Sequence, residues 1–187
     1  RVAAAMSLRP LASDIVFLLQ DPEDPKSINW DVLRETLFCS ERLLVYGFSW
    51  MLWLAWGRAQ FPEDIKDLLQ QKETFFVHSG GWKRLESIKV KKREFDQAIL
   101  MGVGKNSKVV DFYGLVEQMG IIYPLCEHGA RHVPVWADVI IRDIYTLQPL
   151  AKEAGQIQLL NTLAHGAPYH SVLTEDVGRM IPGDCPC

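Results

Sequence analysis

The sequence predicts an α/β fold in which alternating strands and helices are followed by a small β-rich subdomain. Over residues 1–120, short runs of β-branched and aromatic residues alternate with longer segments of helical periodicity. Over residues 121–187, short apolar runs are instead separated by polar turns. Hydrophobic residues make up 48% of the chain and charged residues 23%, a composition typical of a globular core.

The individual elements follow from periodicity and from turn residues. Helices are expected over residues 29–39, 49–60, 62–71 and 92–101, the last closed by Gly102 and Gly104. A short apolar element over residues 13–19 is a further helix candidate, and residues 115–119 form a turn or a short helix. Strands are expected over residues 42–46, 74–78, 109–112, 133–142, 155–163 and 170–178. The aromatic residues of segment 48–56 are expected to be core rather than the lining of an acyl pocket.

Charge and hydropathy exclude two classes of partner. The formal net charge is −3, which gives no electrostatic footprint for nucleic acid. The most apolar stretch, residues 43–56, is shorter than the roughly 20 residues that a membrane-spanning helix needs. The four cysteines are too few and too unevenly spaced for a secreted disulfide scaffold, so the expected location is cytoplasmic.

The first candidate site segment is residues 77–83, where a strand runs into Gly80 and Gly81. Glycines allow the backbone to approach a flat or phosphorylated ligand closely, and free N–H groups can then face that ligand. Taken alone, such a pair is more often an ordinary turn.

Two more segments place carboxylates near strand ends. In residues 111–117, Tyr113 can stack on a base, and Glu117 can ligate Mg²⁺ that bridges phosphates. In residues 171–178, Asp176 suits recognition of ribose hydroxyls. The alternatives are an ordinary strand–turn–helix with a surface glutamate, and a turn aspartate before Gly178.

In this order, the three segments resemble the core motifs of the adenylate-forming enzymes: a Gly-rich adenine loop, Tyr-Gly-x-x-Glu and Thr-Gly-Asp. The resemblance is closest to the acyl-protein synthetase (LuxE) family, which is related to the phenylacetate–CoA ligases. It lies in Gly-Gly-Trp-Lys at 80–83, Asp-Phe-Tyr-Gly-x-x-Glu at 111–117, Leu-Thr-Glu-Asp at 173–176 and the Cys-Pro-Cys at 185–187. It implies that the chain is a partial large domain of an adenylate-forming enzyme, truncated at both ends.

The resemblance also implies roles for individual residues. The nucleotide would be bound by residues from all three segments: Gly80, Gly81 and Trp82 on the adenine side, Asp111 at the amino group, Tyr113 and Gly114 at the ring, and Asp176 at the ribose. Glu117 would be the catalytic residue that holds Mg²⁺. The implied cofactors are therefore ATP and Mg²⁺. One departure is Glu175 in place of the motif's glycine, which adds a negative charge near the nucleotide.

The implied reaction is ATP-dependent activation of a carboxylic acid, with a fatty acid as the first expectation, to acyl-AMP. The acyl group would pass to a protein cysteine and on to a partner reductase. A CoA ligase of the phenylacetate type is an alternative, but such enzymes usually carry an acidic residue and proline in the loop where this chain has Gly-Gly-Trp-Lys. The family's phosphate loop and catalytic lysine have no counterpart here. The isolated chain is therefore expected to be inactive, and a non-catalytic nucleotide- or partner-binding module is the third possibility.

Cysteine and histidine residues form a separate candidate metal site. Cys126, His132, Cys185 and Cys187 offer four ligands, enough for a closed tetrahedral zinc site, with His128 as an alternative to His132. The competing interpretation is buried thiols with exposed histidines. The zinc hypothesis predicts that Cys126 lies close to Cys185 and Cys187. Cys39 is expected to be core.

Overall fold

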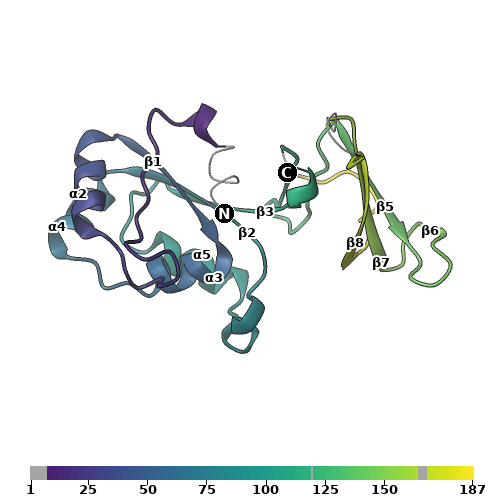
Figure 1. Cartoon of the computed structure of the whole chain (residues 1–187), viewed down its shortest axis with the longest axis horizontal. Coiled ribbons are helices and arrows are strands. Elements are labelled where there is room, and N and C mark those ends of the chain that lie inside the picture. Colours follow the sequence, from purple (N-terminus) through teal and green to yellow (C-terminus); the bar gives the residue numbers. More distant parts are fainter. Residues whose placement is uncertain (1–7, 119, 164–167) are drawn as a thin grey trace. The chain divides into compact units, whose positions relative to one another are not determined.

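The computed structural model describes residues 8–118, 120–163 and 168–187, except for the side chains of Lys83 and Arg84. The chain divides into two compact units, Arg1–Asp111 and Phe112–Cys187 (Figure 1). The first is the α/β part and the second the β-rich part, and the division falls earlier in the chain than residue 120. Among the described residues, no helix is long and apolar enough to cross a membrane.

The first unit alternates strands with helices, as predicted. Its strands are β1 (Arg42–Phe48), β2 (Glu73–Ser79) and the greater part of β3 (Lys108–Tyr113). Its helices are α2 (Trp30–Cys39), α3 (Ser49–Leu52), α4 (Glu63–Gln70) and α5 (Lys92–Leu100), with a π-helix, η2 (Trp53–Gly57), and 3-10 helices η1 (Arg9–Leu11) and η3 (Lys83–Ile88). β1 and β2 pair in parallel, because the helical segments between them supply the crossover that parallel strands require.

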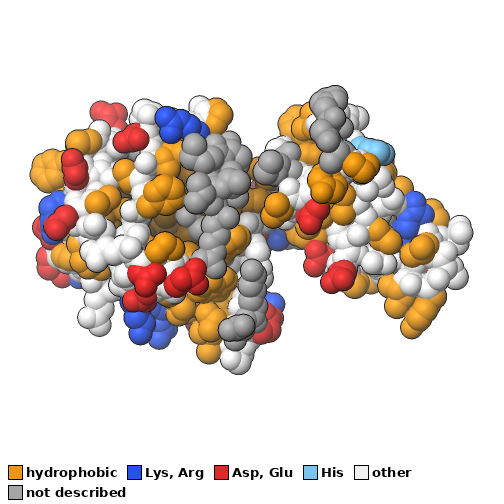
Figure 2. Space-filling model, in the orientation of Figure 1, with side chains coloured by type: hydrophobic (Ala, Val, Ile, Leu, Met, Phe, Trp, Pro, Cys, Tyr) orange, Lys and Arg blue, Asp and Glu red, His pale blue; other side chains and the backbone are white. Residues whose placement is uncertain are grey.

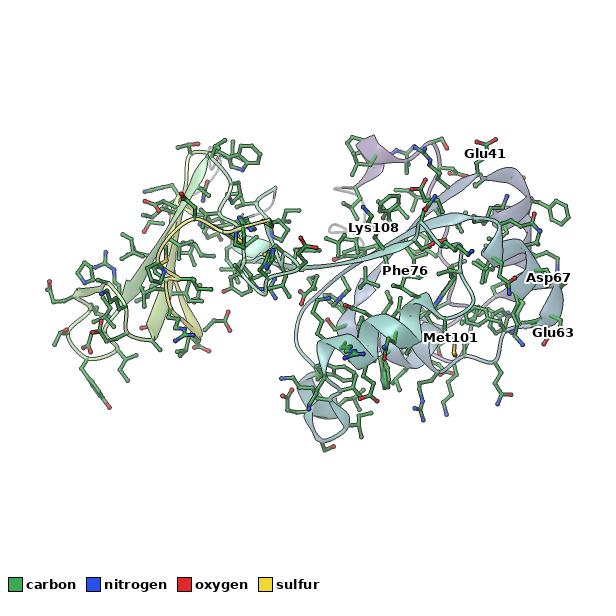
Figure 3. The ribbon with its side chains drawn as sticks, turned by 180° about the vertical axis from the view of Figure 1, so that it is seen from behind. Glu41, Glu63, Asp67, Phe76, Met101 and Lys108 are labelled. Atoms are coloured by element: carbon green, nitrogen blue, oxygen red, sulfur yellow. The ribbon has the colours of Figure 1, made fainter. Side chains whose placement is uncertain are left out.

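The core of this unit forms where β2 meets the helices. The pattern of β2 alternates, so that Thr74, Phe76 and His78 are buried. Phe76 is fully buried, and its ring centroid lies 5.1 Å from that of Trp56. Figure 3 shows Phe76 inside the unit and Glu63 at its rim. Trp53 and Trp56 are also buried in this cluster, so the prediction that these two aromatic residues are core is confirmed.

Two local predictions were wrong. Residues 13–19 form no helix; Leu19 instead makes an antiparallel bridge with Ile28, because the turn that follows reverses the chain. The helix expected over residues 49–60 is α-helical only through Leu52 and then widens into the π-helix. At Gly57, where the π-helix ends, an added Cβ would lie 3.2 Å from the Trp53 ring, so the packing is tight.

The second unit is an antiparallel β structure. The end of β3 pairs with β4 (Tyr123–Pro124), with Tyr113 opposite Tyr123. A 3-10 helix, η4 (Val116–Gln118), follows β3. A second sheet has the strand order β6-β5-β7-β8 and consists of β5 (Ala137–Arg142), β6 (Pro149–Leu150), β7 (Gly155–Asn161) and β8 (Ser171–Gly178). β5 begins later than predicted, since Pro134 lacks the N–H that a ladder needs. Ile121, Tyr123 and Leu159 form the core.

The surface charges agree with the small net charge. Acidic and basic side chains are interspersed on the face drawn in Figure 2, where the described residues form no continuous basic patch. Several positive side chains are paired with acidic ones one helical turn away, such as Lys92 with Asp96 and Lys89 with Glu86. The basic run at residues 89–93 is thus partly neutralised by its own neighbours.

Phe76→Ala tests the core of the first unit. Deleting a fully buried ring removes its contacts and leaves a cavity, so we expect a loss of about 3–5 kcal/mol in the free energy of unfolding. Urea unfolding, monitored by tryptophan fluorescence, measures this free energy, since five of the six tryptophans lie in this unit. The matched control is Phe38→Ala on the 73% exposed ring of α2, which should change stability by less than about 0.5 kcal/mol. Equal losses in the two variants would contradict the assignment.

Candidate functional site

The Gly80–Gly81 loop follows β2 directly. Gly80 has φ +79°, a left-handed conformation that glycine adopts without strain. Both glycines are exposed, and a Cβ built on Gly81 would meet no atom within 4 Å. The Trp82 ring, by contrast, is buried and lies 5.8 Å from the Trp53 ring, centroid to centroid. The loop therefore presents backbone to its surroundings, whereas the expected nucleotide residue Trp82 anchors the loop in the core.

Asp111 lies in β3, the strand that ends the first unit, and is half-buried. The loop glycines and Asp111 thus belong to the first unit, whereas Tyr113, Glu117 and Asp176 belong to the second. That both sets bind one nucleotide stays a prediction.

In the second unit, two predicted nucleotide residues from distant segments meet. The Tyr113 hydroxyl donates a hydrogen bond of 2.6 Å to Oδ2 of Asp176, across 63 positions of sequence. The Asp176 backbone is held by Thr174, whose buried hydroxyl accepts from the Asp176 N–H at 3.2 Å and donates to the Ile157 carbonyl at 2.9 Å. The exposed Asp176 carboxylate is therefore fixed from two sides.

The environment of Tyr113 favours its neutral phenol. Partial burial, together with the hydrogen bond to the Asp176 carboxylate, raises the pKa of Tyr113 above its ordinary value of 10. The phenol therefore remains a hydrogen-bond donor to Asp176 at neutral pH.

Glu117 and Gly114 lie next to this pair in sequence. Glu117 is exposed in η4, whereas its neighbour Gln118 is buried and donates to the carbonyls of Leu159 and Tyr169 at 3.3 and 3.0 Å. These bonds tie the short helix to the antiparallel sheet and leave the Glu117 carboxylate in solvent. At Gly114, an added Cβ would lie 3.1 Å from the Ile121 carbonyl oxygen, so a close backbone approach accounts for the glycine.

The four predicted metal ligands converge within the second unit. The ligand atoms of Cys126, His132, Cys185 and Cys187 all lie within 4.8 Å of one another, which confirms the predicted proximity. Sγ of Cys126 lies 3.6 Å from Sγ of Cys185, and Nε2 of His132 lies 3.2 Å from Sγ of Cys187. A tetrahedron with zinc–ligand bonds of about 2.0–2.3 Å has edges of roughly 3.5–3.8 Å. The Cys126–Cys185 distance lies within this range, and three thiols with one imidazole are a donor set that suits a tetrahedral metal ion.

A tight turn holds the first two ligands. The Cys126 N–H donates to the Ala130 carbonyl at 2.9 Å, and the His132 N–H donates to the Pro124 carbonyl at 3.0 Å. Gly129, with φ +77°, closes the turn. His128, the alternative ligand, is exposed, and its Nε2 lies 3.6 Å from the Glu127 carboxylate. His128 therefore lies outside the cluster. The remaining cysteine, Cys39, is exposed, so the prediction that it is core was wrong.

The thiols of the cluster differ in acidity. Desolvation alone would raise the pKa of the Cys126 thiol, but hydrogen bonds with the Ala130 backbone and the His132 side chain outweigh it and lower the pKa to about 6. The hydrogen bond with Cys185 raises the pKa of Cys187 to about 11. The Cys126 thiol is thus more acidic than the Cys187 thiol, and a deprotonated thiol is the form that binds metals.

The sequence motifs do not include roles for the residues that support these sites. Thr174 occurs within the Leu-Thr-Glu-Asp motif without a predicted role of its own, and Gln118 lies outside every motif. The available signal for Gln118 was a long amide side chain in a segment that leads into the apolar pair Ile121–Ile122. A buried amide there has to find partners, since burying it unpaired is costly.

Tyr113→Phe tests the Tyr113–Asp176 bond through its pH dependence. Below pH 10 we expect the variant to be less stable by about 1 kcal/mol, the net value of one hydrogen bond. Because the folded-state pKa is raised, the unfolded chain ionises first as pH rises above 10, and the difference from wild type should shrink there. Urea unfolding from pH 8 to 11 measures this, with Tyr145→Phe, on a ring that is 87% exposed, as control. A pH-independent difference would contradict the bond.

Comparisons with solved structures agree with the predicted fold. The N-terminal domain of FACL13 from Mycobacterium tuberculosis, solved with an inhibitor, is similar with a TM-score of 0.57 and 13% identity, over 82% of this chain and 39% of that one. ATP-bound MatB from Rhodopseudomonas palustris is similar with a TM-score of 0.50 and 11% identity, over 82% of this chain and 31% of that one. The chain therefore spans less than half the length of either structure.

At such identities the likeness shows the fold alone. The likeness therefore confirms the predicted α/β fold class. No curated protein matches the chain. The family model described as "Acyl-protein synthetase, LuxE" matches residues 29–187, well over half of the chain, and the chain therefore belongs to the acyl-protein synthetase (LuxE) family.

Proposed function

We propose that the chain is part of an ATP-dependent ligase that activates a carboxylic acid as acyl-AMP. The observation that carries the proposal is the hydrogen bond between Tyr113 and Asp176, which joins the two segments expected to hold the adenine and the ribose. An aromatic face next to a fixed, exposed carboxylate suits a nucleoside, because the ring stacks on the base and the carboxylate accepts from ribose hydroxyls.

The chemistry follows from this binding mode. A carboxylate oxygen of the acid attacks the α-phosphorus of ATP, the bond from that phosphorus to the bridging oxygen breaks, and pyrophosphate leaves. Little covalent chemistry is asked of the protein, so positioning and charge stabilisation carry the catalysis. In this scheme Tyr113 and Asp176 fix the nucleoside, which sets the direction from which the acid reaches the α-phosphate.

Glu117 is the residue that fits a magnesium ion. Mg²⁺ in nucleotide sites usually keeps several waters and takes one or two carboxylates together with phosphate oxygens. A single solvent-exposed carboxylate, held on a short helix by its buried neighbour Gln118, meets that need. The ion would neutralise charge on the phosphates as pyrophosphate departs.

The identities of the acid and the acceptor are the finer part of the proposal. Membership of the acyl-protein synthetase family favours a fatty acid and transfer to a protein cysteine, followed by delivery to a partner reductase. The Gly-Gly-Trp-Lys loop supports this over a CoA ligase of the phenylacetate type. ATP–pyrophosphate exchange with a panel of acids, on the complete gene product that contains residues 1–187, tests the activity. Exchange with none of the acids would favour the non-catalytic binding module.

Substitutions of the two carboxylates should separate binding from turnover. Asp176→Ala removes the ribose acceptor and should raise the KM for ATP about 10–100-fold, whereas Asp176→Asn keeps an oxygen for Tyr113 and isolates the effect of the charge. Glu117→Ala should lower kcat by about 100-fold, with a smaller effect on the KM for ATP.

These kinetics are measured by ATP–pyrophosphate exchange on the complete gene product. Glu153→Ala, at an exposed carboxylate after β6, is the control and should leave both constants unchanged. Wild-type kinetics in Asp176→Ala and Glu117→Ala would contradict the assigned roles.

We also propose that Cys126, His132, Cys185 and Cys187 bind a structural zinc ion. The support is that the ligand atoms of one imidazole and three thiols lie within 4.8 Å of one another, with the Cys126–Cys185 distance at 3.6 Å and the His132–Cys187 distance at 3.2 Å. All four ligands come from the protein, which leaves no position for a substrate, so the role is structural rather than catalytic. The ion would cross-link the turn after β4 to the segment after β8.

Zinc content tests this site. The protein purified without chelators should hold about one zinc per chain, since four ligands close a tetrahedral shell. Cys126→Ser should lose most of the metal and lower the melting temperature, because a metal that binds only the folded state stabilises it. Cys39→Ser, at an exposed cysteine outside the cluster, should do neither. Wild-type protein without zinc by elemental analysis would refute the proposal.

A further inference from the structure

A buried serine–histidine pair lies directly behind the Gly80–Gly81 loop. Ser49 begins α3 where β1 ends, and His78 is the penultimate residue of β2. Parallel pairing places Gly47 opposite His78 and Phe48 opposite Ser79, so both residues come to the same edge of the sheet. Ser49 is 6% exposed and His78 is 5% exposed. A buried polar pair at this edge is notable because ligands of α/β sheets bind at the carboxyl ends of strands.

Three contacts meet at the Ser49 hydroxyl. Its Oγ lies 2.8 Å from Nδ1 of His78, 2.7 Å from the carbonyl oxygen of Gly80 and 3.2 Å from that of Ser79. A serine hydroxyl has one proton to donate, and a carbonyl oxygen can only accept. An oxygen–oxygen distance of 2.7 Å is that of an O–H···O hydrogen bond, so the hydroxyl proton goes to Gly80.

The histidine tautomer follows from that assignment. Since the Ser49 proton is used on Gly80, the contact with His78 requires His78 to donate from Nδ1–H. The result is a directed chain from the His78 Nδ1–H to the Ser49 oxygen and from the Ser49 hydroxyl to the Gly80 carbonyl. The His78 ring is itself fixed by the Phe95 ring, at a centroid distance of 4.7 Å.

This chain sets the orientation of one peptide group in the loop. In a trans peptide the C=O and the following N–H point in opposite directions, and the described residues contain no cis peptide bond. Because the Gly80 carbonyl points to the buried Ser49, the Gly81 N–H points away from Ser49. Gly81 lies on the open side of the loop, where a Cβ would meet no atom within 4 Å.

We propose that Ser49 and His78 are positioning residues for the adenine ring of the nucleotide. By fixing the Gly80 carbonyl they hold the Gly81 N–H outward as a donor for a ring nitrogen, and they keep the two glycines flat against the base. The inference rests on the proposed nucleotide site and adds to it two residues that do not touch the ligand. It explains why a polar pair is buried where an apolar pair would be simpler to accommodate.

Four variants of the complete gene product test the proposal. Ser49→Ala removes the hydroxyl that links the His78 Nδ1–H to the Gly80 carbonyl. This variant should raise the KM for ATP about tenfold, while kcat at saturating ATP changes less than about twofold. His78→Phe keeps a ring against Phe95 without the donor and should act in the same direction. His78→Asn keeps an N–H donor near the Nδ1 position and should restore the KM to within about threefold of wild type. Ser87→Ala, at an exposed serine, is the matched control.

A second measurement does not depend on nucleotide. The ¹⁵N chemical shifts of the His78 ring in the wild-type protein report its tautomer, and a protonated Nδ1 is expected. An unprotonated Nδ1, or an unchanged KM for ATP in folded Ser49→Ala, would overturn the proposal. If Ser49→Ala does not fold, the comparison of His78→Phe with His78→Asn tests the proposal. Equal KM values for ATP in those two variants would then overturn the proposal.

Different results would refute the nucleotide site and the positioning role of Ser49 and His78. A wild-type protein that binds no ATP refutes the nucleotide site, and with it the role of the pair, even where the Nδ1–H tautomer is found. A wild-type protein that binds ATP but is indifferent to the His78 donor refutes the positioning role alone.

Discussion

The parallel pairing of β1 with β2 is the constraint on which the first unit depends. Because parallel strands end at the same edge, the register that sets Phe48 opposite Ser79 also brings the start of α3 next to the Gly80–Gly81 loop. The same pairing presents alternate residues of β2 to the helices, with the fully buried Phe76 at the centre. One register therefore decides both the packing of the core and the position of the loop.

In the second unit, one short antiparallel pairing has a comparable effect. Tyr113 lies opposite Tyr123, and three residues after Tyr123 the chain reaches Cys126. The end of β3 thus carries the hydroxyl that holds Asp176, while β4 leads into the turn that carries Cys126 and His132. β8 supplies Asp176, and the segment after it supplies Cys185 and Cys187. The Tyr113–Asp176 pair and the cysteine–histidine cluster are therefore built from the same two stretches of chain, so the proposed zinc ion in the cluster would also restrain the pair.

Both units use buried or half-buried polar contacts to fix groups that are themselves exposed. Gln118 fixes the helix of Glu117, Thr174 fixes the backbone of Asp176, and Ser49 fixes the carbonyl of Gly80. Each support ends on a backbone group, whose position changes little with side-chain motion. A site that relies on positioning rather than on covalent chemistry benefits from such supports, since its contribution to rate depends on geometry.

The sequence alone predicted the order of the longer strands and helices, the glycine and carboxylate segments, and the four cluster residues, with His128 as an alternative to His132. These are local properties: periodicity, turn chemistry and motif order are written in consecutive residues. It predicted a helix at residues 13–19 wrongly, because the pairing of Leu19 with Ile28 overrides local propensity. It predicted wrongly that Cys39 is core and did not reveal that the Trp82 ring is buried, since a residue type does not show which way its side chain points.

Only the tertiary structure decided the contacts between residues far apart in sequence: Tyr113 with Asp176, Cys126 with Cys185, and Ser49 with His78 and Gly80. A hydrogen bond or a ligand set needs ångström-level proximity, which strand register and chain reversal impose and which sequence spacing does not encode.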